Sequence, residues 1–290
     1  PGAEPRHPPT DAMRRLLASP PARVLLLGFV MLVMMGLNDD VMTSYAAEPI
    51  KAVAHIVALA IAGFAIYIGH AHCIERRAVT ELGSTGMGRQ FGIGLLVGAG
   101  LYAACEGVLM ALGIYRIDGL NPLSFLIPAV AMAISSSVFE ELLFSGVLYR
   151  SVETWFRSWA ALGVSSLVFG LSHLANPQAT LEGALFIAVE AGILLGAAVM
   201  LTRQLWLGIG FHMAWNYTQS AIFSGIVSGN DAEAGWIRST VKGPDYLTGG
   251  QFGVESSVLA LVLCTATGIV MLVMAHRRGL VVPPAWKRVA

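Results

Sequence analysis

Charged side chains are scarce in this sequence. They make up 12% of its 290 residues, whereas hydrophobic residues make up 56%; soluble domains carry roughly a quarter of charged residues. The mean hydropathy of +0.68 excludes an ordinary soluble domain and a disordered chain. The formal net charge is zero at pH 7, so the chain lacks the excess of basic residues that would indicate nucleic acid as a partner. The composition predicts an integral membrane protein.

Cysteine is also rare. The three cysteines, Cys73, Cys105 and Cys264, are widely spaced and form no CxxC pair, which argues against a disulfide framework and against a thiolate metal site. We expect them to be small core residues. The HExxH motif is absent as well, which excludes a zincin by motif but not zinc chemistry in general.

Long apolar runs fill most of the chain. A run of about 17 to 25 apolar residues can cross a bilayer as a helix. Eight candidate spans lie near residues 22–38, 50–71, 90–114, 123–149, 159–176, 182–202, 205–227 and 254–275. The sequence therefore predicts an all-α fold, a polytopic bundle of about eight transmembrane helices embedded in the lipid bilayer.

The distribution of lysine and arginine supports an even number of spans. If the N-terminus is cytoplasmic, 14 of the 18 Lys and Arg residues fall inside and 4 fall outside. The four outside would be Lys51, Arg116, Arg238 and Lys242. Because positive charges accumulate on the cytoplasmic side of membrane proteins, we expect both termini to be cytoplasmic.

The spans and the segments between them suggest five regions. Residues 1–21, rich in Pro, Ala and Arg, predict a flexible cytoplasmic tail, although a cleaved signal peptide is a competing interpretation of the first apolar run. Residues 22–121 predict N-terminal transmembrane helices, and residues 122–227 hold most of the polar groups inside apolar runs. Residues 228–253 predict an external loop of turns. Residues 254–290 predict the last transmembrane helix and a short cytoplasmic tail.

Two adjacent glutamates stand out inside the fourth apolar run, in Val138-Phe139-Glu140-Glu141. Ionisable groups at membrane depth are costly and call for a functional explanation. Glu140 and Glu141 lie about ten residues before the end of their run, roughly 15 Å deep at 1.5 Å per residue. Neighbouring positions of an α-helix point about 100° apart. We therefore expect one carboxylate to face a cavity and the other to face a packing partner.

Two further segments, Phe169-Gly-Leu-Ser-His173 and His212-Met-Ala-Trp-Asn216, each place two side chains four residues apart on one helix face. A single histidine or asparagine in a membrane helix can act simply as an interhelical hydrogen-bond donor. A glutamate, two histidines and an asparagine can jointly supply a general base, a proton carrier and oxyanion donors for the attack of water on an amide carbonyl. The same side chains could instead hold Zn²⁺ with one position open for water.

In order and spacing, these segments resemble the three motifs of the CAAX protease and bacteriocin-processing (CPBP) family, also called the abortive-infection family. The similarity covers about residues 125–226, and the Leu247-Thr-Gly-Gly-Gln-Phe-Gly253 loop is also similar to bacterial members. The resemblance implies that residues 122–227 form the catalytic helices. The resemblance implies an intramembrane endopeptidase of the type II CAAX prenyl endopeptidase kind. Its expected substrate is a membrane-associated protein or peptide, prenylated or not, and its expected location is a bacterial inner membrane.

The resemblance also implies roles for five residues. Glu140 with His173 would activate the water, and His212 with Asn216 would form the oxyanion pocket. Glu141 would either share in water activation or hold the site together. Two mechanisms stay open, a glutamate-activated water without cofactor and a metallo-endopeptidase with zinc.

Ser145 departs from the family pattern. The first motif of the family usually reads Glu-Glu-x-x-x-Arg, and Ser145 occupies the arginine position. A nearby cation favours ionised carboxylates, whereas Ser145 can donate one hydrogen bond and no charge. Arg150, more than two helical turns beyond Glu141, is not expected to replace it. The change leaves either a retuned enzyme or a non-catalytic scaffold, and we favour an active enzyme because the groups expected to act on water and carbonyl remain.

Two alternative functions follow from other features. Ser145 motivates a non-catalytic membrane binding or immunity partner built on the same fold. Glu106 and Glu190, single acids inside apolar runs, motivate a proton-coupled transporter, which would be expected to show inverted repeats and broken helices. For each of these two acids, packing in a paired or protonated form is the leading expectation and a cavity-lining role is the alternative.

Overall fold

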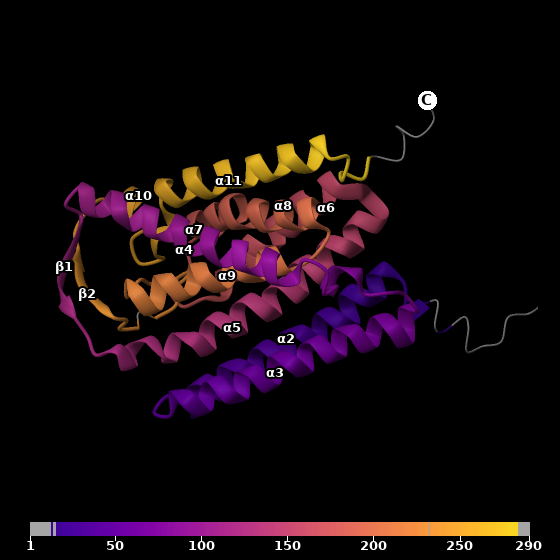
Figure 1. Ribbon diagram of the computed structural model, residues 1–290, viewed down its shortest axis with the longest axis horizontal. Helices are drawn as coiled ribbons and strands as arrows, with labels where there is room; N and C mark the ends of the chain where they lie inside the picture. Colours follow the sequence, from indigo (N-terminus) through magenta and orange to yellow (C-terminus); the bar gives the residue numbers. More distant parts are fainter. Residues whose placement is uncertain (1–12, 14–15, 232, 284–290) are drawn as a thin grey trace, which may run out of the picture.

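The computed structural model describes residues 13, 16–231 and 233–283. The molecule is a bundle of long helices with a small two-stranded sheet at one end (Figure 1). Most of the predicted tail 1–21, and the predicted cytoplasmic tail beyond residue 283, lie outside the described residues.

The main elements follow one another as α2 (Pro20–Ser44), α3 (Pro49–His70), α4 (Met87–Ala111), β1 (Tyr115–Leu120), α5 (Pro128–Glu140), α6 (Arg150–Ser172), α7 (Leu181–Ile187), α8 (Ile193–Thr202), α9 (Trp206–Tyr217), β2 (Ile237–Val241), α10 (Asp245–Thr248) and α11 (Val258–Arg277). Segments of π-helix occupy Ala71–Glu75, Glu141–Tyr149, Ala188–Gly192 and Thr218–Ile222. Short 3-10 turns occupy Thr80–Leu82, Leu123–Leu126, His173–Ala175 and Val254–Ser256.

Six helical stretches of the described chain are long and apolar enough, by length and composition, to cross a membrane. One of them, Leu123–Ala175, runs through α5, a π segment and α6, and its backbone leaves helical geometry at Arg157 (φ 74°, ψ 178°). All eight predicted runs contain a helix, but α9, which has 12 residues, is not among the six stretches. The helices support an integral membrane protein, while the count of eight spans and the orientation of the termini stay predictions.

The region 228–253 contains more regular structure than the expected loop of turns. Its strand β2 pairs antiparallel with β1, which follows α4, and Tyr115 lies opposite Val241. The two strands close one end of the bundle (Figure 1). Short strands that lie more than 100 positions apart in sequence carry little local signal, since each depends on the other for its backbone hydrogen bonds.

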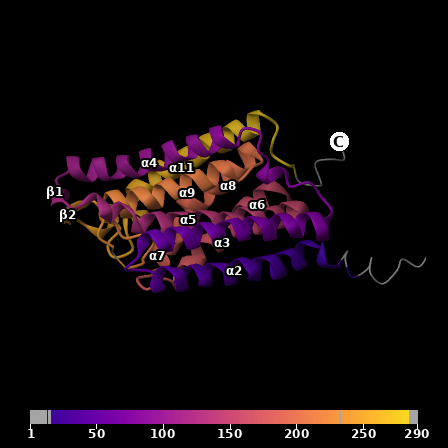
Figure 2. The same cartoon turned by 60° about the horizontal axis from the view of Figure 1, so that its bottom comes forward.

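Helices α4 and α9 approach each other closely, and glycine makes this possible. A Cβ atom at Gly98 of α4 would overlap the carbonyl oxygen of Phe211 in α9. Small residues at such crossings let membrane helices pack backbone to backbone. Figure 2 shows α4 running along α9. The contact holds α9, which carries His212 and Asn216, against the bundle.

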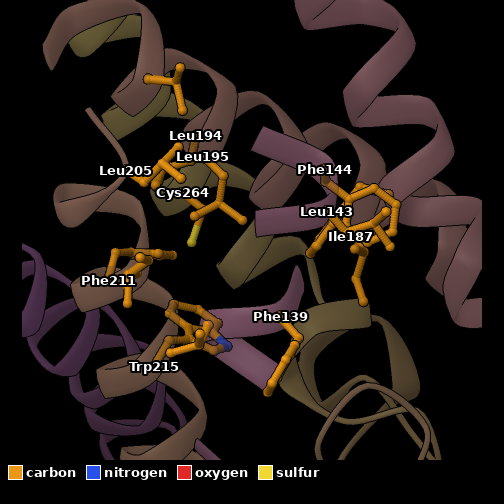
Figure 3. Close-up of a cluster of buried hydrophobic side chains, with 14 of the residues drawn as sticks. Phe139, Leu143, Phe144, Ile187, Leu194, Leu195, Leu205, Phe211, Trp215 and Cys264 are labelled. Atoms are coloured by element: carbon orange, nitrogen blue, oxygen red, sulfur yellow. The ribbon is translucent and has the colours of Figure 1, made fainter. Parts of the chain in front are cut away.

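Apolar side chains from several helices form the buried surroundings of the polar motifs. Figure 3 shows Leu195 of α8, Phe211 and Trp215 of α9, and Cys264 of α11 in one cluster. The rings of Phe211 and Trp215 lie 5.8 Å apart between centroids. Cys264 is buried, as is Cys105, whereas Cys73 is exposed. The polar groups described next are therefore embedded in a packed apolar interior.

Candidate active site

Two adjacent glutamates flank one imidazole ring. The Oε2 atom of Glu140 lies 4.0 Å from Nε2 of His212, and the Oε1 atom of Glu141 lies 3.5 Å from Nδ1 of the same ring. The Glu141 side chain is 1% exposed and the Glu140 side chain is 14% exposed. Of the two carboxylates, Glu140 thus belongs to the more exposed side chain.

A change of helix type falls between these glutamates. The α-helix α5 ends at Glu140, and a π-helix begins at Glu141. In an ideal α-helix the two side chains would point about 100° apart. Wider π turns are rare and are found frequently at functional sites. Here the transition coincides with two consecutive carboxylates that reach opposite nitrogens of His212.

Glu141 is held on its other oxygen. The hydroxyl of Ser145 donates a hydrogen bond of 2.7 Å to Oε2 of Glu141. Gly208 of α9 faces the same oxygen, and a Cβ atom at Gly208 would lie 2.8 Å from it. A small pocket with an empty volume of about 210 Å³ adjoins Glu141 and Ser145. Ser145 therefore supplies one uncharged hydrogen bond at the position where the family motif usually has arginine.

His173 directly follows α6, at the start of the 3-10 turn His173–Ala175, and has a defined orientation. Its Nδ1 atom lies 2.8 Å from the carbonyl oxygen of Phe169, and its ring packs against the Phe169 ring at 4.9 Å between centroids. Because a carbonyl oxygen can only accept a hydrogen bond, this contact places the proton on Nδ1. Nε2 of a neutral His173 is then free to accept a proton.

His173, His212 and Asn216 line one pocket, with an empty volume of about 380 Å³ that includes its opening to solvent. The amide nitrogen of Asn216 donates to Oγ of Ser136 at 2.9 Å, which orients the amide. The other side chains of the pocket wall are Phe169, Ile187, Glu190, Ala191, Leu195, Phe211, Trp215, Ser228, Glu255 and Cys264.

The five predicted site residues are brought together around His212, although not in every pairing expected. Glu140 and Glu141 contact His212, while His173 and Asn216 share the pocket with it. Neither Glu140 nor Glu141 belongs to the lining of the larger pocket. Within the described chain, no hydrogen bond or ion pair joins Glu140 to His173, so their joint action on water stays a prediction.

Several polar atoms at this centre have no hydrogen-bond partner among the described residues: Oε2 of Glu140, Oε1 of Glu141 and Nδ1 of His212. Buried polar atoms are nearly always paired, and exceptions call for an explanation. Hydrogen bonds of catalytic groups are often long before a substrate is bound. The unpaired atoms of the three residues are therefore consistent with a site that takes up water and a polar substrate.

Glu255 was not among the predicted site residues, although it lies on the wall of the larger pocket. Its carboxylate accepts hydrogen bonds from Nε1 of Trp215 at 3.2 Å and from Oγ of Ser228 at 3.0 Å. The available signal was its position, directly after the loop 247–253 that resembles bacterial family members.

A metal centre is not supported by the placement of potential ligands. Over residues 16–231 and 233–283, no group of three or more His, Cys, Asp or Glu side chains is arranged to hold a metal ion. The carboxylates of Glu140 and Glu141 approach His212, and His173 points its nitrogen to a backbone carbonyl.

Residues 122–218 match a family model described as type II CAAX prenyl endopeptidase Rce1-like. The matched segment runs from the start of α5 to the end of α9 and contains Glu140, Glu141, His173, His212 and Asn216. No curated protein and no solved structure matches the chain. The match thus covers the helices that build most of the site and leaves Glu255 outside.

Proposed function

Because residues 122–218 match the type II CAAX prenyl endopeptidase Rce1-like family model, we propose that this chain is an intramembrane endopeptidase that hydrolyses a peptide bond of a membrane-associated protein or peptide. The observation that carries the proposal is the position of His212, flanked by Glu140 and Glu141 beside a pocket that also contains His173 and Asn216. Acid–base groups and potential oxyanion donors on separate helices converge there, as amide hydrolysis requires.

In the proposed reaction, Glu140 and His173 receive the proton of the attacking water. Glu140 is the more exposed carboxylate, and Nε2 of His173 is free to accept. The water oxygen forms a bond to the carbonyl carbon, and the carbonyl π electrons move to its oxygen. His212 and Asn216 donate hydrogen bonds to this oxyanion. Collapse of the intermediate breaks the carbon–nitrogen bond, and the stored proton passes to the leaving amine.

Glu141 has a positioning role in this proposal. It is almost fully buried, and the Ser145 hydroxyl and the open space at Gly208 determine where its carboxylate lies. From that position it faces Nδ1 of His212. A His212 ring protonated on both nitrogens directs its Nδ1–H to Glu141 and its Nε2–H to the reacting carbonyl. A side chain placed in this way fixes the direction of the histidine ring.

The decisive experiment compares wild type with Glu140→Gln in liposomes. The substrates are quenched fluorescent peptides with and without a farnesyl-cysteine anchor, each assayed with and without a chelator. Loss of a general base typically lowers the rate by about 10²- to 10⁴-fold, and we expect Glu140→Gln to be affected to that degree at unchanged expression and melting temperature. The matched control is Glu106→Gln, since Glu106 is buried, accepts the Tyr102 hydroxyl at 2.9 Å and does not line the pocket.

Normal cleavage by Glu140→Gln at a normal expression level would contradict the proposed mechanism. Inhibition by the chelator would establish a metal-dependent reaction, and cleavage restricted to anchored peptides would establish a prenylated substrate. These three readouts are independent of one another because each changes a different component of the assay.

A non-catalytic binding or immunity partner is the second candidate, and Ser145 favours it. Ser145 leaves Glu141 without a guanidinium neighbour, and its hydroxyl is the donor that Glu141 has instead. If this loss has inactivated the protein, Ser145→Arg should create or raise peptide cleavage, because a guanidinium beside Glu141 favours its ionised form. An unchanged rate in Ser145→Arg would count against this candidate.

The proposed location is a bacterial inner membrane, with both termini on the cytoplasmic side. Charged residues gather at the end of the bundle where α2 begins: Glu75 pairs with Arg23 and Arg77, and Glu81 pairs with Arg77 and Arg150. An arginine-rich end is the feature that the positive-inside rule assigns to the cytoplasm. The opposite end carries the sheet of β1 and β2 (Figure 1).

A further inference from the structure

Glu190 is a buried acid on the wall of the larger pocket. It is 1% exposed, and its Oε2 atom has no hydrogen-bond partner among the described residues. It lies in the π segment Ala188–Gly192, which interrupts the helical stretch between α7 and α8. An unpaired buried polar atom costs free energy, and π turns occur frequently at functional sites. Glu190 thus combines an unpaired buried oxygen with a place on the pocket wall, which leaves this oxygen available to a ligand.

The pocket around Glu190 has two histidines in its wall, His173 and His212, but no lysine or arginine. Its lining residues include a second acid, Glu255. The two carboxyl groups are close enough to interact electrostatically. Glu255 already receives hydrogen bonds from Trp215 and Ser228. Glu190 is thus the carboxyl group of this wall that still has an oxygen available.

Apolar side chains form much of the same pocket wall. Ile187, Leu195, Phe211 and Cys264 are buried and belong to the pocket lining. A lysine side chain combines an apolar four-carbon stem with a compact ammonium group that carries three donors. This combination matches an apolar pocket that contains one unpaired carboxyl oxygen.

We propose that Glu190 determines substrate specificity by binding the ammonium group of a lysine side chain in the peptide that enters this pocket. The inference rests on the proposed function, because it needs a peptide in the pocket. The contact is a charge-assisted hydrogen bond, which is stronger than a neutral one. Glu190 is already buried in the free protein, so only the ammonium group loses its water when the pair forms.

The test uses pairs of quenched peptides that differ at one position, which holds either lysine or norleucine, with that position moved stepwise along the peptide. We compare kcat/KM for each pair in wild type, Glu190→Gln and Glu190→Met, the last of which removes all polarity. The matched control is Glu106→Gln, because Glu106 is also buried with an unpaired Oε2 atom but lies outside the pocket.

At one peptide position we expect wild type to prefer lysine over norleucine by about tenfold or more, as sites built around a buried polar contact do. In both Glu190 variants the ratio should fall to about one, with the loss falling on the lysine peptide. Glu106→Gln should keep the wild-type ratio. A lysine preference that survives in both Glu190 variants would overturn the inference.

Binding of the same peptides, carrying a dye, to Glu140→Gln separates this inference from the proposed function. Suppose that wild type cleaves no peptide, but that Glu140→Gln binds lysine peptides about tenfold more tightly than norleucine peptides. If the Glu140→Gln/Glu190→Gln double variant loses this preference, the endopeptidase proposal fails while the lysine site holds. Equal binding of the two peptides by Glu140→Gln, or no binding of either, overturns the lysine site.

Discussion

Replacing Gly208 with alanine tests whether the position of Glu141 matters for activity more than for stability. The new Cβ atom would lie 2.8 Å from Oε2 of Glu141, about 0.6 Å inside the ordinary contact distance of 3.4 Å. Glu141 is buried and bonded to Ser145, so it can give way only by moving its carboxylate. That movement changes its approach to His212, which starts from 3.5 Å.

Two opposing effects set the change in stability. Overpacking a buried site costs about 1–3 kcal/mol, whereas alanine in place of glycine inside a helix contributes about 1 kcal/mol. The net loss for Gly208→Ala is therefore about 0–2 kcal/mol. A displacement of about 1 Å at a catalytic group can cost about 100-fold in rate, so a shift of roughly half that distance should lower kcat by about tenfold.

The assay measures peptide cleavage and thermal unfolding on the same purified samples. Gly163→Ala is the matched control, since Gly163 lies inside α6 and a Cβ atom there would meet nothing within 4 Å. It should keep its activity and gain up to about 1 kcal/mol of stability. The double variant Gly208→Ala/Glu141→Ala removes the clashing oxygen, so the destabilising effect of Gly208→Ala should disappear in that background.

Wild-type cleavage by Gly208→Ala would refute the reasoning that Glu141 positions His212. A loss of stability that persists in the Glu141→Ala background would show that the alanine clashes elsewhere. Only the combination of a small change in melting temperature, a clear loss of rate and non-additivity with Glu141→Ala supports the positioning role.

Three other predictions follow from polar contacts and exposure. Ser145→Ala removes the donor to Glu141 and should lower the free energy of unfolding by about 1–3 kcal/mol in thermal or denaturant unfolding. Ser145→Thr keeps a hydroxyl and should retain most of the wild-type stability. Equal losses of stability in both variants would show that the hydroxyl is not the cause. Burial raises the pKa of Glu81. A hydrogen bond from Arg77, the charge of Arg150 and a hydrogen bond from Tyr67 outweigh the effect of burial, so the pKa of Glu81 lies below 4.5. Ionised Glu81 therefore stabilises the fold above pH 4.5, and this stabilisation should be lost as the pH falls from 4.5 through the lowered pKa. The melting temperature should drop in that window, less so in Arg77→Met, and a flat profile in wild type would contradict the ion pair. Cys73 is the one exposed cysteine of the described residues, and the proposed orientation puts it on the cytoplasmic side. A membrane-impermeant maleimide should therefore label Cys73 in inverted vesicles and not in right-side-out vesicles. The reverse pattern would overturn the proposed orientation.

The helical runs could be predicted from the sequence because the membrane leaves few choices. In hydrocarbon, backbone groups must find their hydrogen bonds within the protein, and a continuous apolar segment does so as a helix. Each of the eight predicted runs contains a helix in the structure. The strands β1 and β2 could not be predicted in the same way, because each short strand needs a partner that is remote in sequence.

The candidate residues were also visible in the sequence, since polar side chains inside apolar runs are few. Their grouping around one ring was only partly visible. The expectation that Glu140 and Glu141 would divide between a cavity and a packing partner came from an ideal α-helix, whereas a π-helix begins at Glu141 and both carboxylates approach His212. For Glu190, the sequence favours a packing role over a cavity-lining one. In the structure Glu190 lies on the pocket wall, a position that depends on how the helices pack.

By itself, therefore, the sequence determined that this is a membrane protein of apolar helices with three polar motifs at depth, because the costs of exposing backbone and charge to lipid act on each segment separately. Only the tertiary structure decided which carboxylate meets which histidine. That choice depends on the close α4–α9 packing at Gly98, on the space left at Gly208, and on the π turns beside the pocket. Such contacts join positions far apart in the chain, so no local pattern of residues specifies them.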